Sequence, residues 1–479
     1  MAATRAGGVV PIRREAPQLI VHRQQWEETA ARLPAGELSL VSLWAEPERV
    51  HMAVMSPADA AVSVLTLEGK RFPSVGRVHA PAMRLERAAR DLYGVEPEGL
   101  PDTRQWLRHD EPYRFLPAEG ESLHQIPVGP VHAGIIEPGH FRFTANGETV
   151  VRLEERLGYV HKGTEALMAG ASLERAAQLA GRVSGDSTVA YALAFARAVE
   201  AASGLVTTPR AVWLRAVMAE LERLANHFGD IGAVCNDAAF AILYAQFGWL
   251  REQVLRTAAG CFGHRLMMDC IVPGGVRADL GQEGAEALRA LLALIRSRFP
   301  ELVEVYDDTE SLKDRTVDTG ILGGALAAQY AAGGYVGRAS GRNFDARRTP
   351  GYAPYDALDF DVPVVNAGDV NARVWIRIRE VGQSVALIEQ LLARLPQTSV
   401  QAPISGLRAG EGWALIEGFR GDVFVWVRIG ADGRVERCHL RDPSWFQWPL
   451  LEAAIEGNIV ADFPLCNKSF NCSYSGHDL

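Results

Sequence analysis

Lysine is scarce in this sequence. Of 479 residues, 49 are lysine or arginine, and the lysines are only Lys70, Lys162, Lys313 and Lys468. The arginines are scattered along the chain, and the formal net charge is −9. Proteins that bind nucleic acids concentrate basic residues on one face. The composition therefore argues against nucleic acid as a partner.

Paired cysteines and long apolar runs are missing as well. The six cysteines form no C-x-x-C pair, so we expect them to be reduced and mostly buried. No apolar run reaches the roughly 18 residues of a membrane-spanning helix. The first residues, MAATRAGGVVPIRREAPQ, hold no apolar stretch of a signal peptide. We therefore expect a soluble protein of a reducing compartment.

The length of the chain predicts two or three domains, and the first is predicted to be α+β. Met83–Tyr93 carries apolar residues at helical spacing, and Gly94 should end that helix. Short apolar or alternating runs predict strands before it. These runs are Leu38–Glu46, His51–Met55, Ala61–Leu67 and Arg71–His79.

The segment from Phe72 to Arg104 resembles the small hydrophilic subunit of respiratory complex I that supports the quinone-cavity subunit. The matching residues, in order, are Phe72-Pro73-Ser74, Glu86, Asp91-Leu92-Tyr93-Gly94, Gly99 and Pro101-Asp102. A generic capped helix and turn is the alternative. The resemblance implies that residues 1–108 are a 30 kDa subunit-like docking domain without catalytic residues.

Residues 109–128 are polar and contain proline, which predicts a linker. Residues 129–479 resemble the large subunit of membrane-bound, energy-converting nickel–iron hydrogenases of the formate hydrogenlyase and hydrogenase-4 type, and the related 49 kDa quinone-cavity subunit of complex I. The domain order resembles the fused form of the two complex I subunits. The matching residues are Gly129-Pro130, Glu137–Arg142, Tyr159–Glu165, Glu220, Arg223, His227, Gly263–Arg265, Pro273–Val276, Gly337–Gly341, Asp345, Arg347, Gly368-Asp369, Arg441–Ser444 and Gly457-Asn458.

The large domain is predicted to be mainly helical. Apolar residues at helical spacing predict helices over 173–179, 188–202, 212–228, 237–259, 284–303 and 381–395. Hairpins are predicted around Asn146-Gly147 and Asp432-Gly433. The expected fold class is therefore α+β, with a small N-terminal α+β domain and a large helical bundle that carries peripheral hairpins.

Two short segments at opposite ends of the large domain carry the main functional prediction. One contains Ser184 and Ser187 in GRVSGDSTVAY, and the other contains Ser473 and Gly476 in NCSYSGH. The resemblance implies that nickel–iron hydrogenases place four thiolates at these positions, because soft sulfur ligands hold nickel through redox changes. Hydroxyls and glycine are poor replacements. We expect no bound metal and no hydrogen turnover, and these four residues should line the remaining cavity. The end of the chain directly after the second segment fits this expectation.

The resemblance to complex I also raises the possibility of a quinone site. It implies a quinone-binding tyrosine and histidine, but these positions hold Gly185 and a residue near Pro138. Asp186, Tyr191 and Tyr474 are candidate substitutes in the same segments. No nucleotide-binding motif is present, so any NADH chemistry would belong to another subunit.

Glu137, His140 and His161 are the candidate proton-relay residues. Glu137 matches a carboxylate that the resembling hydrogenases place near their metal pocket. Burial in a cleft would raise the pKa of such a carboxyl toward neutrality, where histidine also titrates. The structural alternatives are that Glu137 orients the hairpin, that His161 caps the next helix, and that Arg142 pairs with Glu165.

Charged residues in the middle of the domain complete the candidates. Glu220, Arg223 and His227 lie along one helical face, where a buried polar network is expected. Arg338 and Asp345 lie on a glycine-rich loop and face either the cavity or a neighbouring subunit.

These patterns favour a cavity-forming subunit of a membrane-bound, complex I-like oxidoreductase that couples electron transfer to ion translocation. Quinone is the expected acceptor by elimination. The chain itself would bind no cofactor. A small iron–sulfur subunit would supply the nearest cluster, and antiporter-like and anchor subunits would hold the chain at the cytoplasmic side of the membrane.

A non-catalytic scaffold is the alternative from another class. Solvent access to Ser184, Ser187, Ser473 and Glu137 in one cavity favours the enzyme subunit, and apolar side chains filling that space favour the scaffold. An active hydrogenase, the third reading, would need turnover without any of the four thiolates.

Overall fold

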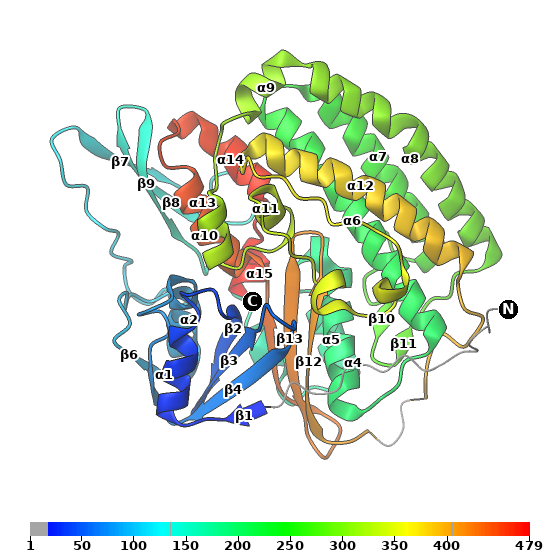
Figure 1. Ribbon diagram of the computed structural model, residues 1–479, viewed down its shortest axis with the longest axis horizontal. Coiled ribbons are helices and arrows are strands. Elements are labelled where there is room, and N and C mark those ends of the chain that lie inside the picture. Colours follow the sequence, from blue (N-terminus) through cyan, green and yellow to red (C-terminus); the bar gives the residue numbers. More distant parts are fainter. Residues whose placement is uncertain (1–17, 135, 404–406) are drawn as a thin grey trace.

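Long helices lie on one side of the protein and small sheets on the other, as the computed structural model in Figure 1 shows. Residues 18–134, 136–403 and 407–479 are described. The mixed composition of helices and several small sheets confirms the predicted α+β class.

The N-terminal sheet has the strand order β1-β4-β3-β2. Its strands are β1 (Gln18–Ile20), β2 (Ser39–Glu46), β3 (Arg49–Met55) and β4 (Val62–Glu68), and helix α1 (Arg23–Ala31) follows β1. The predicted helix is α2 (Met83–Tyr93), and Gly94 ends it in the left-handed region with φ of 67°. The strand predicted over 71–79 is only β5 (Arg71–Pro73), which pairs with β6 (Glu96–Glu98), because the chain turns after Pro73.

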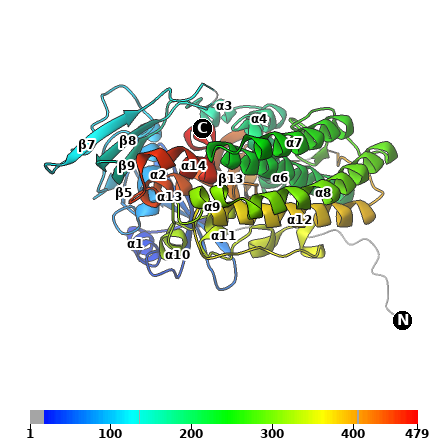
Figure 2. The same ribbon diagram turned by 90° about the horizontal axis from the view of Figure 1, so that it is seen from above.

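A second sheet, β7-β8-β9, projects from one end of the molecule (Figures 1 and 2). Strands β8 (His140–Asn146) and β9 (Thr149–Arg156) form the predicted hairpin, in which Gly147 has φ of 58°. Strand β7 (Leu123–Val128) pairs with β8. The last six residues of the predicted linker are therefore part of a sheet.

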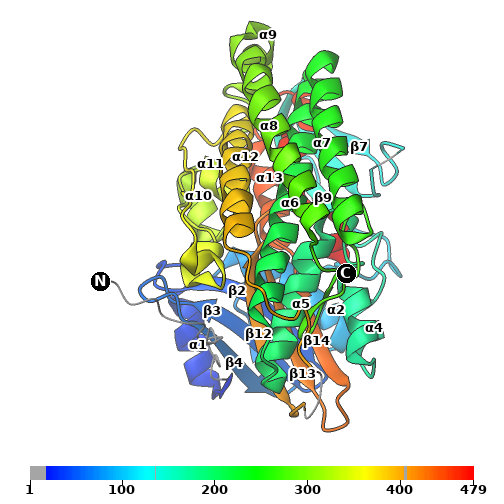
Figure 3. The ribbon, with the colours of Figure 1, turned by 90° about the vertical axis from the view of Figure 1, so that its right-hand side faces the viewer.

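Long helices form the bundle, and they run side by side in Figure 3. They are α5 (Thr188–Ser203), α6 (Pro209–Asp237), α7 (Ala241–Phe262), α8 (Gln282–Asp308) and α12 (Val370–Ala393). Helix α12 begins well before the predicted residue 381. Its first turns bury charged residues such as Arg373 and Arg377, so the apolar pattern that marks a helix face is interrupted there. In the part of the chain that the structure describes, no helix has the length and apolar character needed to cross a membrane.

A third sheet joins the two halves of the molecule. Strands β12 (Gly410–Glu417), β13 (Asp422–Ile429) and β14 (Val435–Arg441) pair antiparallel, and α5 packs on β12 and β13. On the N-terminal side, the Trp44 ring of β2 stacks on His439 with centroids 4.7 Å apart. The predicted hairpin corresponds to β13 and β14, whereas β12 was not predicted.

Short elements complete the chain. Helix α15 is the one that bears on the site, because it contains one of the two functional segments. The short elements are α3 (Thr164–Met168), α4 (Leu173–Ala180), β10 (Ile271–Val272), β11 (Gly275–Val276), α9 (Glu310–Thr316), α10 (Gly324–Gln329), α11 (Gly334–Ala339), α13 (Ser444–Ala454), α14 (Phe463–Phe470) and α15 (Tyr474–Asp478).

Candidate functional site

The two segments that resemble metal-ligand positions lie against each other. Ser184 precedes the first turn of α5, and Ser473 caps α15. The Ser473 hydroxyl donates to Ser184 Oγ at 3.2 Å and accepts from the backbone N–H of Gly476 at 2.9 Å. The three serines are buried. Residues 289 positions apart in the sequence therefore meet at one place, which we call the serine site: Ser184, Ser187, Ser473 and Gly476.

An ion pair fills the serine site. Arg420, in the turn between β12 and β13, places Nη2 2.6 Å from Asp186 Oδ2, and its Nη1 donates to Ser187 Oγ at 3.1 Å. The Ser184 hydroxyl donates to Asp186 Oδ1 at 2.5 Å. Burial disfavours the ionised form of Asp186, but Arg420 and the two hydroxyls outweigh burial and keep its pKa below the usual range. The carboxylate of this segment is thus held by an internal cation.

The Gly476 position has no room for a side chain. A Cβ built there would lie 2.5 Å from Asp442 Oδ2 and 2.9 Å from Ser473 Oγ. Asp442 is itself fixed, because it accepts from the Tyr191 hydroxyl at 2.7 Å and from the backbone N–H of Ser444 at 2.8 Å. Burial and the neighbouring Asp442 carboxylate raise the pKa of Tyr191 well above its ordinary value. Tyr191 is therefore a neutral hydrogen-bond donor inside the protein.

Glu137 is exposed rather than set in a desolvated cleft. It lies on the loop before β8, and its Oε2 accepts from the backbone N–H of Ser475 at 3.0 Å. The expectation of a buried carboxyl at this position is therefore wrong for this chain, since the side chain reaches α15 from the solvent side.

The three candidate relay residues are not bonded to one another within the described part of the chain. His140 is buried; its Nδ1 bonds to the carbonyl of Gly129 at 3.1 Å, and its Nε2 accepts from Arg142 Nε at 3.3 Å. His161 is exposed and bonds through Nδ1 to the carbonyl of Asp478 at 2.7 Å. Each histidine thus holds a different backbone segment, and neither contacts Glu137 directly.

Tyr474 lies beside the serine site and is almost fully buried. Its ring packs on Trp448 with centroids 4.8 Å apart, and its hydroxyl lies 3.3 Å from His132 Nε2. Burial raises its pKa above the ordinary value of tyrosine. Gly139 packs so closely on the ring that a Cβ there would lie 2.6 Å from it. Tyr474 therefore couples the loop before β8 to α15.

Arg338 and Asp345 face neither a cavity nor a neighbouring subunit. Both side chains are fully buried and belong to one ion-pair network with Glu380 and Glu417. The network also includes the α6 residues Glu220, Arg223 and His227. The predicted buried network around α6 is observed, and it is larger than the sequence indicated.

Asp186 also borders a cavity of about 90 Å³ between α6 and α7. Gly185 and Asp186 form one end of the cavity, and Glu222 and Asn226 of α6 lie beside them. Burial raises the pKa of Glu222 to about 8 in spite of the backbone N–H groups of Val189 and Ala190 that it accepts. The remaining wall is mostly apolar and comes from α6, α7 and the loop 265–267. This cavity is the part of the site that a small ligand reaches from solvent.

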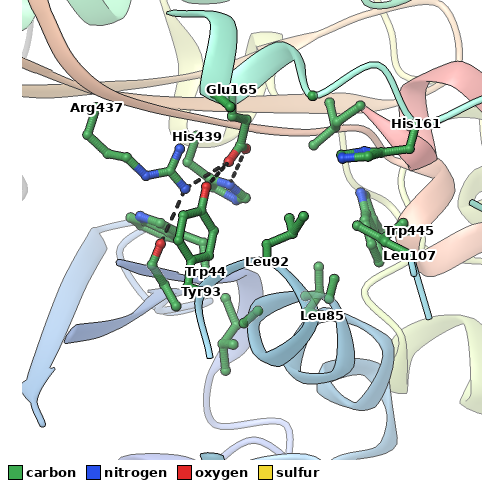
Figure 4. Close-up of a pocket in the computed structure, with 17 residues that line it drawn as sticks. Trp44, Leu85, Leu92, Tyr93, Leu107, His161, Glu165, Arg437, His439 and Trp445 are labelled. Atoms are coloured by element: carbon green, nitrogen blue, oxygen red, sulfur yellow. Dashed lines mark hydrogen bonds and ion pairs between the residues drawn. The ribbon is translucent and has the colours of Figure 1, made fainter. Parts of the chain in front are cut away.

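A second cavity, of about 70 Å³, lies between the two domains (Figure 4). Its apolar wall includes Leu85 and Leu92 of α2, and its polar end is Glu165, which pairs with Arg437 at 2.8 Å and His439 at 2.8 Å. Glu165 pairs with these residues and not with Arg142, as the sequence had suggested.

A serine–histidine–glutamate arrangement lies at the same domain boundary. The Ser42 hydroxyl bonds to His439 Nε2 at 2.7 Å, and His439 Nδ1 bonds to Glu165. The spacing resembles that of a hydrolase triad. Ser42 is 0% exposed, however, so no substrate reaches its oxygen. The arrangement connects the N-terminal domain to β14.

Sequence reasoning missed Arg420 and the spatial role of Asp442. Arg420 stands in G-F-R-G-D between two strands that were not both predicted, so nothing placed it near Ser184. A single arginine between glycines in a turn was the available signal. Asp442 was noted only as part of the R-D-P-S motif.

Comparisons with known proteins agree with this architecture. The family described as respiratory-chain NADH dehydrogenase, 49 Kd subunit, matches residues 237–407, and the family described as the 30 Kd subunit matches residues 19–121. The chain belongs to the family of complex I 49 kDa subunits and membrane-bound hydrogenase large subunits, with a 30 kDa subunit domain fused in front of it.

Named relatives come from both branches of this family. Carbon monoxide-induced hydrogenase of Rhodospirillum rubrum is 31% identical over 352 residues, which cover 73% of this chain and 98% of that protein. Formate hydrogenlyase subunit 5 of Escherichia coli (strain K12) is 31% identical over 440 residues, which cover 85% and 77%. An NADH-quinone oxidoreductase subunit of Roseiflexus sp. (strain RS-1) is 33% identical over 352 residues, which cover 71% and 94%.

Proposed function

We propose that this chain is a cavity-forming subunit of a membrane-bound, complex I-like oxidoreductase that works without a nickel–iron centre and without hydrogenase activity. The Arg420–Asp186 ion pair inside the serine site is the observation that carries this proposal. It places a permanent internal salt bridge between the positions where the resembling hydrogenases hold their metal.

The donor atoms of the serine site do not fit a nickel–iron centre. Ser184, Ser187 and Ser473 offer hydroxyl oxygens, which are hard donors, whereas nickel in such sites needs soft thiolates. The Gly476 position offers no side chain, and Asp442 Oδ2 takes the space a thiolate would need. Among the described residues, no three His, Cys, Asp or Glu side chains are grouped to hold a metal ion.

Quinone is the acceptor that we propose, with the cavity between α6 and α7 as its binding place. The cavity combines apolar walls with a polar end at Asp186, Glu222 and Asn226, which suits a ring with carbonyl oxygens. Relatives whose names contain NADH-quinone oxidoreductase support this choice. Glu137 remains our candidate for proton exchange at the outer side of α15, where it contacts solvent and Ser475.

The remaining parts of the proposal concern the assembly. The chain would carry no cofactor, a small iron–sulfur subunit would supply the cluster next to the cavity, and antiporter-like and anchor subunits would hold it at the cytoplasmic side of the membrane. Electron transfer at the cavity would be coupled to ion translocation in those subunits.

A scaffold role is the second candidate function. It is favoured by the complete bonding of the serine site, where the hydroxyls of Ser184, Ser187 and Ser473 all have partners inside the protein. In that case the polar network replaces the metal as a structural element, and the chain holds its partners together without turnover.

The test uses the complex purified with its membrane partners. Nickel content, iron–sulfur signals and reduction of a short-chain quinone would be measured for the wild type, Glu137→Gln and Asp186→Asn. Asp269→Asn is the matched control, because Asp269 also pairs with an arginine, Arg182 at 2.6 Å, but on the surface.

We expect no stoichiometric nickel, intact iron–sulfur signals, and quinone reduction that falls at least tenfold in Asp186→Asn and stays unchanged in Asp269→Asn. Stoichiometric nickel would overturn the proposal. An intact wild-type complex that reduces no quinone would favour the scaffold role.

A further inference from the structure

Eight ionisable side chains form one buried cluster between α6, α11, α12 and the end of β12. Each side chain is at most 1% exposed, and each lies within 3.5 Å of an oppositely charged neighbour. The members are Glu220, Arg223, His227, Arg338, Asp345, Arg347, Glu380 and Glu417. No part of this cluster is used in the function proposed above.

The charges of the cluster do not balance. It contains three guanidinium groups and four carboxyl groups, so that with a neutral histidine its net charge would be 3 − 4 = −1. A net charge in the protein interior is costly, and buried groups generally avoid it by binding or releasing a proton. We therefore expect the cluster to hold one extra proton.

His227 is a poor place for this proton. Its Nε2 lies 2.7 Å from Glu380 Oε2 and donates to it in the neutral form. Its Nδ1 is buried and has no hydrogen-bond partner. Charging the ring would bury a second N–H without an acceptor, which costs the desolvation energy of that group. The pKa of His227 is lowered by burial, in agreement with a neutral ring.

Glu417 is the carboxyl group with the least compensation. Its Oε1 accepts from Arg338 at 2.8 Å, and its Oε2 accepts from the backbone N–H of Ala346 at 2.9 Å. Arg338 is shared, since it also pairs with Glu380 and Asp345. The other carboxyl groups each have a closer or second cationic partner, such as the two contacts of Arg347 with Asp345 at 3.0 and 2.7 Å.

The charged groups around Glu417 come from every packed element. Arg338 faces it from α11, Arg223 from α6, Asp345 from the loop before α12 and Asp422 from β13. Arg342 lies near enough to interact with its charge. Burial and then repulsion by Asp345 outweigh the two arginines and raise the pKa of Glu417 to about 7.

Glu417 and Arg420 are on the same tight turn, which begins at the end of β12 and ends at Asp422. Arg223 donates to the carbonyls of Glu417 and Gly418 at 2.9 and 3.0 Å. On the other side, Gly334 at the start of α11 packs so closely that a Cβ there would lie 2.1 Å from the carbonyl oxygen of Arg420. The turn is thus held between α6 and α11, and a movement at one end is passed to the other.

A second contact connects the cluster with the serine site. The Arg420 guanidinium lies 4.5 Å from the centre of the Phe419 ring, and the edge of that ring meets the His227 ring with centroids 6.3 Å apart. Arg420 therefore packs on a residue that contacts the cluster, while its charged end reaches Asp186.

We propose that Glu417 is a buried proton-binding residue whose protonation is linked, through the Glu417–Asp422 turn, to the Arg420–Asp186 ion pair of the serine site. Linkage is reciprocal, so any group that competes with Asp186 for Arg420 changes the proton affinity of Glu417. The inference deepens the proposed function, because it supplies a proton-binding group that responds to events at the site. Its test, however, requires no turnover.

The test is infrared difference spectroscopy of the purified complex, titrated from pH 5 to pH 9. The spectrum of the wild type minus that of Glu417→Gln isolates the carboxyl band of Glu417. The same difference in an Asp186→Asn background shows whether the site affects it. Glu86→Gln supplies the matched control, because Glu86 is a buried glutamate of the N-terminal domain whose pKa burial raises to about 7.

We expect a protonated carboxyl band for Glu417 that titrates near neutral pH. Removal of the Asp186 charge leaves Arg420 uncompensated, so the midpoint should move to lower pH by about one unit, a tenfold change in proton affinity that is typical of coupled sites. The Glu86 band should not move. No band difference in Glu417→Gln, or an unchanged midpoint in Asp186→Asn, would overturn the inference.

Two safeguards keep this test decisive. If Glu417→Gln does not fold, Glu417→Asp must shift the frequency of the band, and an unshifted band would overturn the assignment. The titration depends on neither nickel nor quinone, so it fails independently of the proposed function.

Discussion

At the scale of single residues, the serine site is defined by very close packing. Hydroxyls, one carboxylate and one guanidinium fill a space that would otherwise be a cavity, and Gly476 completes it by having no side chain. The absence of a Cβ at this position is therefore a steric requirement of the folded protein.

Gly476→Ala should destabilise the protein by about 1–3 kcal/mol, because overpacking a well-packed interior costs energy of that order. The new Cβ would lie 2.5 Å from Asp442 Oδ2. The measurement is the free energy of unfolding in denaturant. Gly185→Ala is the control, since no heavy atom lies within 4 Å of a Cβ there, and it should change stability by less than about 0.5 kcal/mol. Equal effects of the two substitutions would contradict the steric account.

At the scale of elements, helix ends position the charged residues of the core. Helix α12 carries Arg373, Arg377 and Glu380 on its buried face. Its start therefore decides where these side chains lie, and Asp369 marks that start.

Asp369→Ala should cost about 1–2 kcal/mol, the usual loss for a helix cap. Its Oδ1 accepts from the backbone N–H of Ala372 at 2.7 Å, and its Oδ2 accepts from that of Asp318 at 2.9 Å. Asp369→Asn keeps one acceptor oxygen and should lose less. Thermal unfolding of the three proteins checks this order, and an alanine variant as stable as the wild type would argue against the cap.

At the scale of the whole molecule, polar contacts connect the two domains. Ser42 of β2, His439 of β14 and Glu165 of α3 form one chain of hydrogen bonds across the boundary, and the rings around them are packed. The fused domains are therefore joined by an interior and not only by the connecting segment.

Glu165 makes this boundary sensitive to acid. Burial opposes its ionisation, but Arg437 and His439 outweigh burial and lower its pKa to about 2. A lowered pKa contributes stability that is present above the pKa of the unfolded chain, about 4.3, and is lost as the pH falls through the folded value. Glu165→Gln should therefore cost about 3 kcal/mol at pH 7.

The pH dependence of unfolding provides the check. The difference in free energy of unfolding between wild type and Glu165→Gln should be constant above about pH 5 and vanish toward about pH 2. Glu27→Gln is the comparison, because that glutamate is an exposed surface residue and should show little difference at any pH. A difference that does not depend on pH would show that Glu165 acts by packing alone.

Local pattern determined much of what was predicted correctly. Helical periodicity located α2, α5, α7 and α8, and the Asn146-Gly147 turn located the hairpin of β8 and β9. The two functional segments were found from their own residues. These features depend on neighbours along the chain, so the sequence is sufficient to predict them.

Only the tertiary structure decided the chemistry of the site. Arg420 and Asp186 are 234 residues apart, and nothing in either segment indicates that they form an ion pair. The same holds for the exposure of Glu137 and for the burial of Arg338 and Asp345 in one cluster. Charge and burial depend on which elements pack together, and a pKa depends on both. The sequence alone therefore determined the family, the fold class and the residue types of the two functional segments, whereas the packing of distant segments determined how those residues are bonded.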